Sequence, residues 1–167
     1  MLLQLRLFTF AYNIIKPKPK LIINRNGAGV ERYIDGSHFD GGFVGGEKCG
    51  EGLAVFADGS SYSGNWMKNG MSGYGTFKWD DGREYVGMWK ENEMFGHGTF
   101  TWRDGKRYVG SFKADKKDGN GKLTWPDGKS YEGGWKGGKQ SGKGRIRYTD
   151  GRELVGTWID GQRVSEV

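Results

Sequence analysis

The sequence predicts an all-β fold in which stacked 23-residue β-hairpins form one elongated, twisted, single antiparallel sheet. The first observation behind this prediction is a fixed period: the dipeptide Asp-Gly recurs every 23 residues without insertion or deletion. The second is that large residues and glycines recur at fixed positions between these pairs, spaced by two, as side chains on one face of a strand are. A constant period of this length indicates an array of one small unit. The array units begin at Asp35, Asp58, Asp81, Asp104, Asp127 and Asp150.

The first strand of each unit follows the Asp-Gly pair and carries a large residue, a glycine and an aromatic residue at spacing two. In the second unit these are Tyr62, Gly64 and Trp66, which the spacing places on one face. Asp-Gly between two such runs is a strong hairpin signal, because glycine tolerates the positive φ that tight turns require. Equivalent triplets begin at Phe39, Tyr85, Tyr108, Tyr131 and Leu154.

The second strand of each unit begins with Gly-x-Gly and continues with an apolar residue and an aromatic residue at spacing two. Gly73, Gly75, Phe77 and Trp79 are the example in the second unit. Glycine normally weakens the interior of a strand, yet three glycines of each unit fall on the aromatic face. We therefore expect a neighbouring ring to lie over each bare Cα, which packs that face without a globular core.

The predicted domain organisation is one array with short segments at both ends. Residues 1–34 form an N-terminal arm or capping segment with a Lys-Pro linker, residues 35–164 form the array, and residues 165–167 form a tail. Within the arm, Gly27, Gly29 and Tyr33 form a faint half-unit in the register of the array. Residues 1–15 are too short and interrupted for a transmembrane helix. A capping strand, a docking arm and a mitochondrial targeting segment remain as alternative interpretations of residues 1–20.

Charge and cysteine content restrict the function classes. The net charge is +6, but residues 1–30 carry five basic and no acidic residues, so the array is almost neutral. A nucleic-acid reader is expected to show a basic stripe on its folded surface, so we do not expect nucleic acid as a partner. The single cysteine, Cys49, excludes an intrachain disulfide and is typical of a reducing compartment.

The sequence carries no recognisable catalytic, cofactor or metal motif. The Gly-x-Gly pairs fall inside predicted strands and lack the following helix of a phosphate-binding loop. The two histidines, His38 and His97, occupy columns that vary between units. The turn aspartates are separated by whole repeats, too far for a catalytic carboxylate pair. We expect a protein that is not an enzyme and needs no cofactor or metal.

The repeat unit resembles the MORN (membrane occupation and recognition nexus) repeat. The segment from Tyr131 to Lys139, followed by Gly142-Lys143-Gly144, carries the resemblance, as does the segment beginning at Tyr85. It covers roughly residues 35–164, as five full units and a partial sixth, and the divergent end units are interpreted as caps. The resemblance implies eukaryotic cytoskeletal or membrane-contact settings, such as ciliary radial spokes, myosin-tail binding and junctional tethers.

The favoured hypothesis is a non-catalytic scaffold or protein-binding subunit of a cytoplasmic, cytoskeletal or ciliary assembly resembling a radial spoke. A glycine-cleared, ring-lined groove can receive a partner helix or extended peptide, with the aromatic residues as anchors. A homodimer of two arrays is left open. The predicted groove residues are Tyr62, Trp66, Trp79, Tyr85, Trp89, Trp102, Tyr108, Trp125, Tyr131 and Trp135.

The alternative hypothesis is a peripheral tether that binds anionic phospholipid through a basic edge and the N-terminal arm. Lysines at equivalent positions of successive units could line one edge and attract lipid headgroups, each worth about 1 kcal/mol near the surface. The competing interpretation is a solvated edge whose charges prevent aggregation. MORN arrays also precede catalytic domains in some enzymes, but Met1 and the capped last unit favour a chain that is not such a fragment. The predicted lipid-edge residues are Lys90, Lys113, Lys116, Lys117, Lys136 and Lys139.

Overall fold

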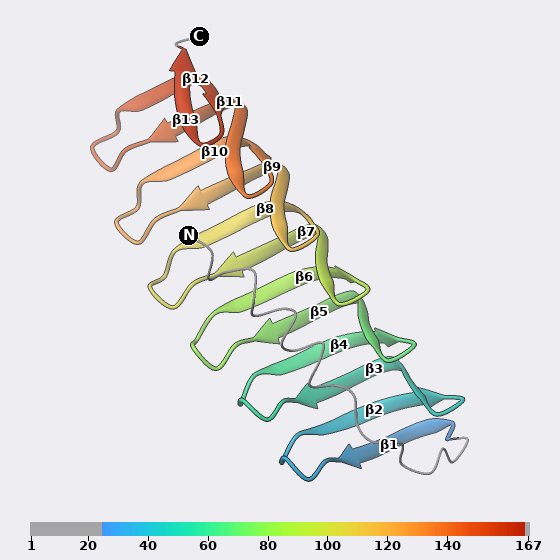
Figure 1. Ribbon diagram of the computed structural model, residues 1–167. Coiled ribbons are helices and arrows are strands. Elements are labelled where there is room, and N and C mark those ends of the chain that lie inside the picture. Colours follow the sequence, from blue (N-terminus) through green and yellow to red (C-terminus); the bar gives the residue numbers. More distant parts are fainter. Residues whose placement is uncertain (1–24, 166–167) are drawn as a thin grey trace.

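The computed structural model describes residues 25–165, which form one antiparallel sheet of 13 strands in sequence order (Figure 1). These residues contain no helix. Each strand pairs with the next, so the hairpins stack along a twisted axis, and the predicted all-β elongated sheet is confirmed. The strands are β1 (Gly27–Arg32), β2 (His38–Val44), β3 (Glu47–Val55), β4 (Ser61–Met67), β5 (Gly70–Lys78), β6 (Glu84–Lys90), β7 (Glu93–Thr101), β8 (Arg107–Lys113), β9 (Lys116–Thr124), β10 (Ser130–Lys136), β11 (Lys139–Arg147), β12 (Glu153–Ile159) and β13 (Gln162–Ser165).

The Asp-Gly pairs form the turns from each odd strand to the next even strand, on the left in Figure 1. Gly59 has a φ of +87°, and its N–H donates to the Phe56 carbonyl at 3.0 Å. The Asp58 carboxylate accepts from the Ser60 N–H at 2.9 Å. All six turns repeat this aspartate bond, so each aspartate fixes its own turn, as its side chain commonly does.

The opposite turns, from even to odd strands, each contain two residues with positive φ. Between β6 and β7 these are Glu91 at +52° and Asn92 at +71°, the geometry that matches the twist of paired strands. The Asn92 amide oxygen accepts from the Met71 N–H at 2.8 Å, and the Asn92 N–H donates to the Met71 carbonyl at 3.0 Å. These turns therefore also join each repeat to the preceding one.

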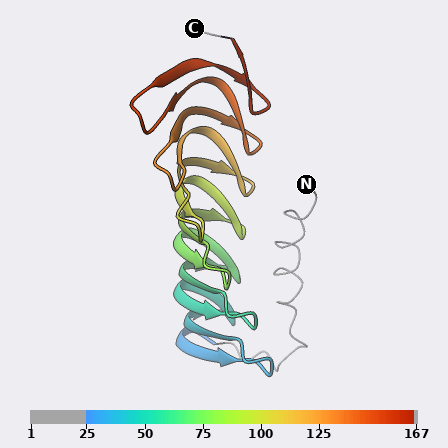
Figure 2. The ribbon, with the colours of Figure 1, turned by 90° about the vertical axis from the view of Figure 1, so that its left-hand side faces the viewer.

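A bulge interrupts the pairing of most even strands with the following odd strand, one residue before the second ring. From Gly64 to Trp66 of β4 the partner in β5 passes from Gly75 to Met71, so the extra residues lie in β5, opposite Asn65. The Tyr62 hydroxyl donates to the Asn65 carbonyl at 3.0 Å, and Tyr85, Tyr108 and Tyr131 make the same bond. Bulges bend strands, and the strands are visibly curved in Figure 2.

Glycines face each other beneath these tyrosines. Gly64 pairs with Gly75 across β4 and β5. A Cβ on Gly64 would lie 2.5 Å from the Gly75 Cα, and a Cβ on Gly75 would collide with the Tyr62 ring. The expected packing of a ring over bare Cα atoms is confirmed for this pair, and Tyr85, Tyr108 and Tyr131 cover equivalent pairs. The expectation is wrong for the third glycine of the unit: Gly73 has a φ of +74°, and a Cβ there would meet Asn65 and no ring.

The core is a zipper of rings that runs along the sheet. The even strands β2 to β10 contribute two rings each and β12 contributes one, and each tyrosine meets the second ring of its own strand and the corresponding ring of the next even strand edge-to-face. Centroid separations are 5.0–5.5 Å, and such pairs are worth about 0.5–1.5 kcal/mol each beyond burial. In order, the zipper contains Phe43, Phe39, Trp66, Tyr62, Trp89, Tyr85, Phe112, Tyr108, Trp135, Tyr131 and Trp158.

The ends of the sheet differ from the predicted domain boundaries. The sheet begins at Gly27, inside the segment assigned to the N-terminal arm, because β1 pairs with β2 over the register Gly27–Phe43 to Arg32–His38. At the other end β13 adds a strand that pairs with β12. The predictions for residues 1–20, and for the last two residues of the tail, lie outside the described residues.

Gly98→Ala tests the packing of rings over glycines. The new methyl group would collide with the Tyr85 ring and with its hydroxyl, which donates to the Met88 carbonyl. We expect the free energy of unfolding in urea to fall by about 1–3 kcal/mol, the usual cost of overpacking. His97→Ala, an exposed neighbour on the same strand, is the control. An unchanged urea midpoint in Gly98→Ala would show that the ring can move aside without cost.

Asp115→Asn tests the turn that follows β8. The Asp115 carboxylate accepts from the Met94 N–H at 2.7 Å, and burial raises its pKa to about 6. Because the folded-state pKa lies above the ordinary value, ionisation destabilises the fold as pH rises from about 4 to about 6. Asparagine occupies the equivalent positions 69 and 92 and keeps the acceptor. We expect the variant to be stabilised by about 1 kcal/mol at pH 7, after discounting for solvent screening, in thermal unfolding.

The pH dependence supplies the control for this variant. The gain from Asp115→Asn should disappear below about pH 4, where aspartate is protonated in both the folded and unfolded chain. Asp104→Asn, in an exposed turn, should leave the curve unchanged. A gain that is the same at pH 4 and pH 7 would contradict a charge effect.

Candidate functional site

Seven of the ten predicted groove residues lie inside the zipper. Their side chains are between 0% and 6% exposed, so in this structure they offer almost no surface to a partner. Trp89 is typical: it is 2% exposed, and its indole N–H donates to the Gly75 carbonyl at 3.3 Å. The groove role of this set stays a prediction that the packing does not favour. The seven are Tyr62, Trp66, Tyr85, Trp89, Tyr108, Tyr131 and Trp135.

The remaining three, Trp79, Trp102 and Trp125, are only half-buried and stand beside the Asp-Gly turns. Phe56 and Tyr148 occupy the same position in the repeats before and after them and are also half-buried. The five side chains form one line, which we call the exposed ring row because part of each half-buried ring remains in solvent. Two strand spacings separate successive members, about 10 Å. The sequence pattern contained Phe56 and Tyr148 but did not distinguish exposed from buried rings.

Cations lie against the exposed ring row. The Arg83 guanidinium is 5.1 Å from the Trp79 ring centroid, and the Lys106 ammonium is 4.6 Å from that of Trp102. Lys129 and Arg152 have the same relation to Trp125 and Tyr148, at 5.2 and 5.3 Å. Sequence analysis missed these side chains, although a basic residue after Asp-Gly in four successive units was the available signal. The four residues Arg83, Lys106, Lys129 and Arg152 form the cation row.

Lys117 does not lie on the predicted lipid edge. It is the second residue of β9, and its ammonium sits on the aromatic face, 4.0 Å from the ring centroid of Trp135. The ring centroids of Tyr108 and Trp102 lie 5.6 and 5.8 Å away. Burial, reinforced by the nearby Lys106 charge, lowers the pKa of Lys117 to about 8. This prediction was wrong because Lys117 was assigned to the turn. The turn ends at Asp115, and Lys117 already belongs to β9, which begins at Lys116.

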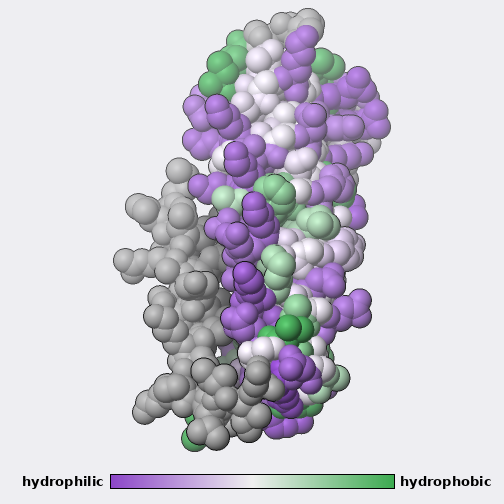
Figure 3. Space-filling model, turned by 90° about the vertical axis from the view of Figure 1, so that its right-hand side faces the viewer, coloured by the Kyte–Doolittle hydropathy of each residue, from purple (hydrophilic) through white to green (hydrophobic). Residues whose placement is uncertain are grey.

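The other predicted edge lysines are exposed. Lys90, Lys113 and Lys136 end β6, β8 and β10, and Lys116 and Lys139 begin the strands after them. These five form the lysine edge, on the side of the molecule shown in Figure 3, which is mostly hydrophilic with apolar patches. Lys139 is partly neutralised, because Asp160 lies 3.6 Å from its ammonium.

Sequence analysis also missed an apolar patch on the face opposite the zipper. Tyr74 of β5, Met88 of β6 and Phe95 of β7 are 59%, 41% and 44% exposed. Tyr74 is the register partner of Met88. The available signal was their departure from the repeat, since Tyr74 stands in a column that otherwise holds polar or charged residues.

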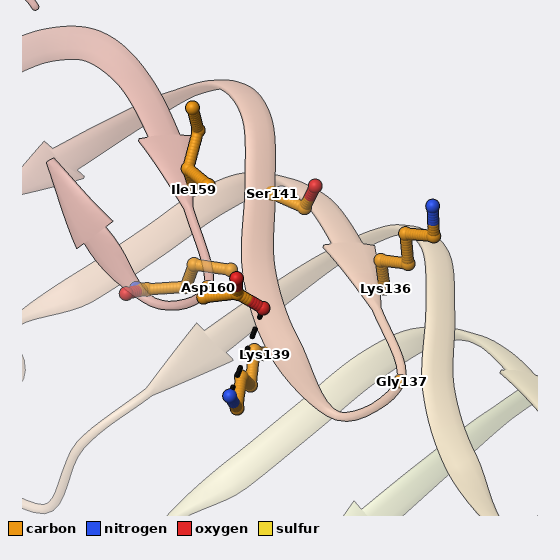
Figure 4. Close-up of a pocket in the computed structure, with 7 residues that line it drawn as sticks. Lys136, Gly137, Lys139, Ser141, Ile159 and Asp160 are labelled. Carbon is orange, nitrogen blue, oxygen red and sulfur yellow. Dashed lines mark ion pairs between the residues drawn. The ribbon is translucent and has the colours of Figure 1, made fainter. Parts of the chain in front are cut away.

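A shallow hollow of about 430 Å³ lies between the turn after β10 and the turn after β12 (Figure 4). Lys136 and Ser141 line it, together with Ile159 and the Lys139–Asp160 ion pair. No member of the exposed ring row or the cation row contributes to it. The hollow is therefore part of the lysine edge and separate from the aromatic face.

Two further searches bear on the chemistry of the described part of the chain. Residues 25–165 contain no group of three or more histidine, cysteine, aspartate or glutamate side chains placed to hold a metal ion. Nor does this part of the chain include a helix with the length and apolar character needed to cross a membrane.

One comparison with known proteins, the match to a family model, agrees with the repeat pattern. Among solved structures, the TCP domain of SAS-4 (dCPAP) from Drosophila melanogaster, in complex with a proline-rich motif of Ana2 (dSTIL), is similar at 14% identity and a TM-score of 0.46, over 84% of this chain and 86% of that chain. No curated protein matches the sequence. The family model described as MORN repeat matches residues 39–61, 62–82, 85–107, 108–130 and 131–151, which together exceed half of the chain. With five consecutive units matched along one continuous sheet, the chain belongs to the MORN-repeat family.

Proposed function

We propose that this protein is a non-catalytic binding module that holds a partner's helix or extended peptide against the exposed ring row. The observation that carries the proposal is the division of the aromatic residues into two sets. One set is buried in the zipper, whereas Phe56, Trp79, Trp102, Trp125 and Tyr148 keep part of each ring in solvent at one-repeat intervals. Rings of this kind are frequent binding anchors.

Packing holds the exposed ring row in position before a partner arrives. Trp79 contacts Phe77 and Phe100 at centroid distances of 4.6 and 5.3 Å, and Trp102 contacts Phe100 at 4.5 Å. Because these rings are already ordered, a partner would not have to immobilise them, which lowers the entropic cost of binding.

The spacing of the row limits the shape of the partner. Members about 10 Å apart match apolar side chains at every third residue of an extended peptide in the polyproline II conformation, which has three residues per turn and rises about 3.1 Å per residue. They also match every seventh residue of a helix, which rises about 1.5 Å per residue. Membership of the MORN-repeat family supports binding of a partner. We further propose that the two belong to a larger cytoplasmic assembly, cytoskeletal or ciliary.

Trp102→Ala/Trp125→Ala tests the exposed ring row. We expect this double variant to lose at least one protein that the unchanged chain captures from native extract, because two adjacent anchors are removed. The half-buried rings can be removed with less damage to the zipper than Trp89, so circular dichroism should still show a folded sheet.

Tyr74→Ala/Phe95→Ala is the matched control, because it removes two exposed rings from the opposite face. Capture that survives the Trp102→Ala/Trp125→Ala change but is lost in this control would place the binding surface on the apolar patch. Capture unaffected by either change would reject a ring-based binding mode.

The second candidate function is attachment to an anionic membrane through the lysine edge. Its support is the line of exposed lysines that ends β6, β8 and β10, namely Lys90, Lys113 and Lys136. If this edge binds lipid, changing all three to glutamine should reduce binding to phosphatidylserine vesicles in sedimentation, by about fivefold per charge. The Trp102→Ala/Trp125→Ala variant should bind these vesicles unchanged. Equal vesicle binding by the triple variant and the unchanged chain would exclude the edge.

A further inference from the structure

Lys48 and Lys117 occupy the same position of different repeats and have similar surroundings. Lys48 is the second residue of β3 and Lys117 the second residue of β9. The Lys48 ammonium lies 5.2 Å from the ring centroid of Phe39 and 5.5 Å from that of Tyr33. Tyr108 and Trp102 are the rings at the equivalent places around Lys117. The two sites are therefore two versions of one ring-lined ammonium site.

The Lys48 site contains a carboxylate from the protein itself. Glu31 of β1 places an oxygen 3.5 Å from the Lys48 ammonium. The Tyr33 hydroxyl accepts a hydrogen bond from Lys48 at 3.1 Å and donates one to Glu31 at 2.6 Å. A lysine that is only 8% exposed is thus paired with an opposite charge, as buried charges generally are.

The Lys117 site lacks that carboxylate. The residue that corresponds to Glu31 is Phe100, which is buried in the core. Within the described residues, neither Lys117 nor the adjacent Lys106 makes an ion pair. Lys106 brings a second ammonium to the site, against the same Trp102 ring that lies beside Lys117.

The positive charges of Lys117 and Lys106 therefore have no opposite charge beside them among the described residues. Both lie against Trp102, which keeps part of its ring in solvent. Two like charges on a partly desolvated surface disfavour protonation, which agrees with the lowered pKa of Lys117. An incoming carboxylate would reverse this effect, because it favours the protonated amine. Arg83 and Arg152, at the ends of the cation row, pair instead with Asp81 and Asp150 at 2.7 Å.

We propose that Lys117 and Lys106, beside Trp102, form a carboxylate-binding site that receives a glutamate or aspartate side chain of an acidic partner segment. The carboxylate takes the place at Lys117 that Glu31 takes at Lys48. This inference rests on the proposed function, since the segment lies along the exposed ring row, and it specifies the partner as acidic.

The next unpaired cation sets the spacing of the partner's acids. Lys129 lies one repeat beyond Lys106, against Trp125 and Tyr148, and makes no ion pair with a described residue. One repeat is about 10 Å, so a segment in the polyproline II conformation, with three residues per turn and a rise of about 3.1 Å per residue, places an acid at every third residue beside both cations.

The test uses a labelled peptide of about twelve residues with glutamate at every third position and leucine and proline between, because proline favours the polyproline II conformation, and the same peptide with glutamine in place of glutamate. Binding to the full chain is measured by fluorescence anisotropy. We expect the glutamate peptide to bind more tightly, with an affinity that falls as salt concentration rises. Lys117→Met should weaken its binding by about tenfold, the loss of one charge-assisted contact.

Lys117→Met is compatible with the fold, because Met71 and Met94 are buried at the same position of the neighbouring repeats. Lys122→Met is the matched control: this lysine lies on the same strand, exposed, on the opposite face, and its loss should not change the affinity. The titrating and charged groups around Lys117 are Lys106 and Tyr108. Because the carboxylate needs the protonated amine, affinity should also decline as pH rises above about 8, and this decline should be absent in Lys117→Met.

The outcomes separate this inference from the proposed function. Equal binding of both peptides, with loss in Trp102→Ala/Trp125→Ala, overturns the carboxylate site but leaves the ring row as a binding surface. Equal effects of Lys117→Met and Lys122→Met also overturn the site. If neither peptide binds, or if Lys117→Met instead reduces binding only to phosphatidylserine vesicles, the acidic-segment proposal is wrong.

Discussion

The fold depends on one close contact: two glycine Cα atoms face each other across neighbouring strands under a single tyrosine ring. A side chain at either position would occupy the space of the ring, as the collision of a Cβ on Gly75 with Tyr62 shows. Because the ring can lie flat over the backbone, its hydroxyl reaches the Asn65 carbonyl opposite the bulge, and its edge reaches Trp66 and Trp89. Glycines that would weaken an ordinary strand are here what permits the core.

This contact explains how a single sheet can be stable without a second layer. A sheet normally buries its apolar face against another sheet or against helices. Here the rings of one repeat cover those of the next, so Tyr85 is fully buried although residues 25–165 place no second layer above it. Such packing depends only on neighbouring units, as in other linear repeat proteins. It also leaves the rings beside the Asp-Gly turns, such as Trp102, only half covered, and these rings form the surface on which we propose that a partner binds.

The repeat and its period could be read from the sequence because every unit must satisfy the same contact, so identical residues return at identical places. The second set of turns could not, since its two positive-φ residues differ between units, as Asn92 and Asp115 show. The bulge did leave a signal, because its positive-φ residue, such as Gly73, is glycine in every unit, but the spacing alone assigned that glycine to the ring-covered face. The division of the rings into buried and exposed sets was equally hidden: Trp89 and Trp102 are the same residue type in the same spacing pattern. Only the packing in the structure shows that Trp89 lies within the zipper and that Trp102 packs against its edge.

The distribution of charge over the two faces follows from the same geometry. Positions beside the zipper are desolvated, so a lysine there needs an opposite charge, a ring, or a neutral replacement. The repeats display all three solutions in one column: Lys48 with Glu31, Lys117 among Trp102, Tyr108 and Trp135, and methionine at position 71. Since methionine is evidently sufficient for packing, the fold does not require a cation at Lys117. Lys117 places a charge beside the half-buried Trp102 ring, where stability does not require one. Binding of a partner therefore explains this lysine better than a role in stabilising the fold.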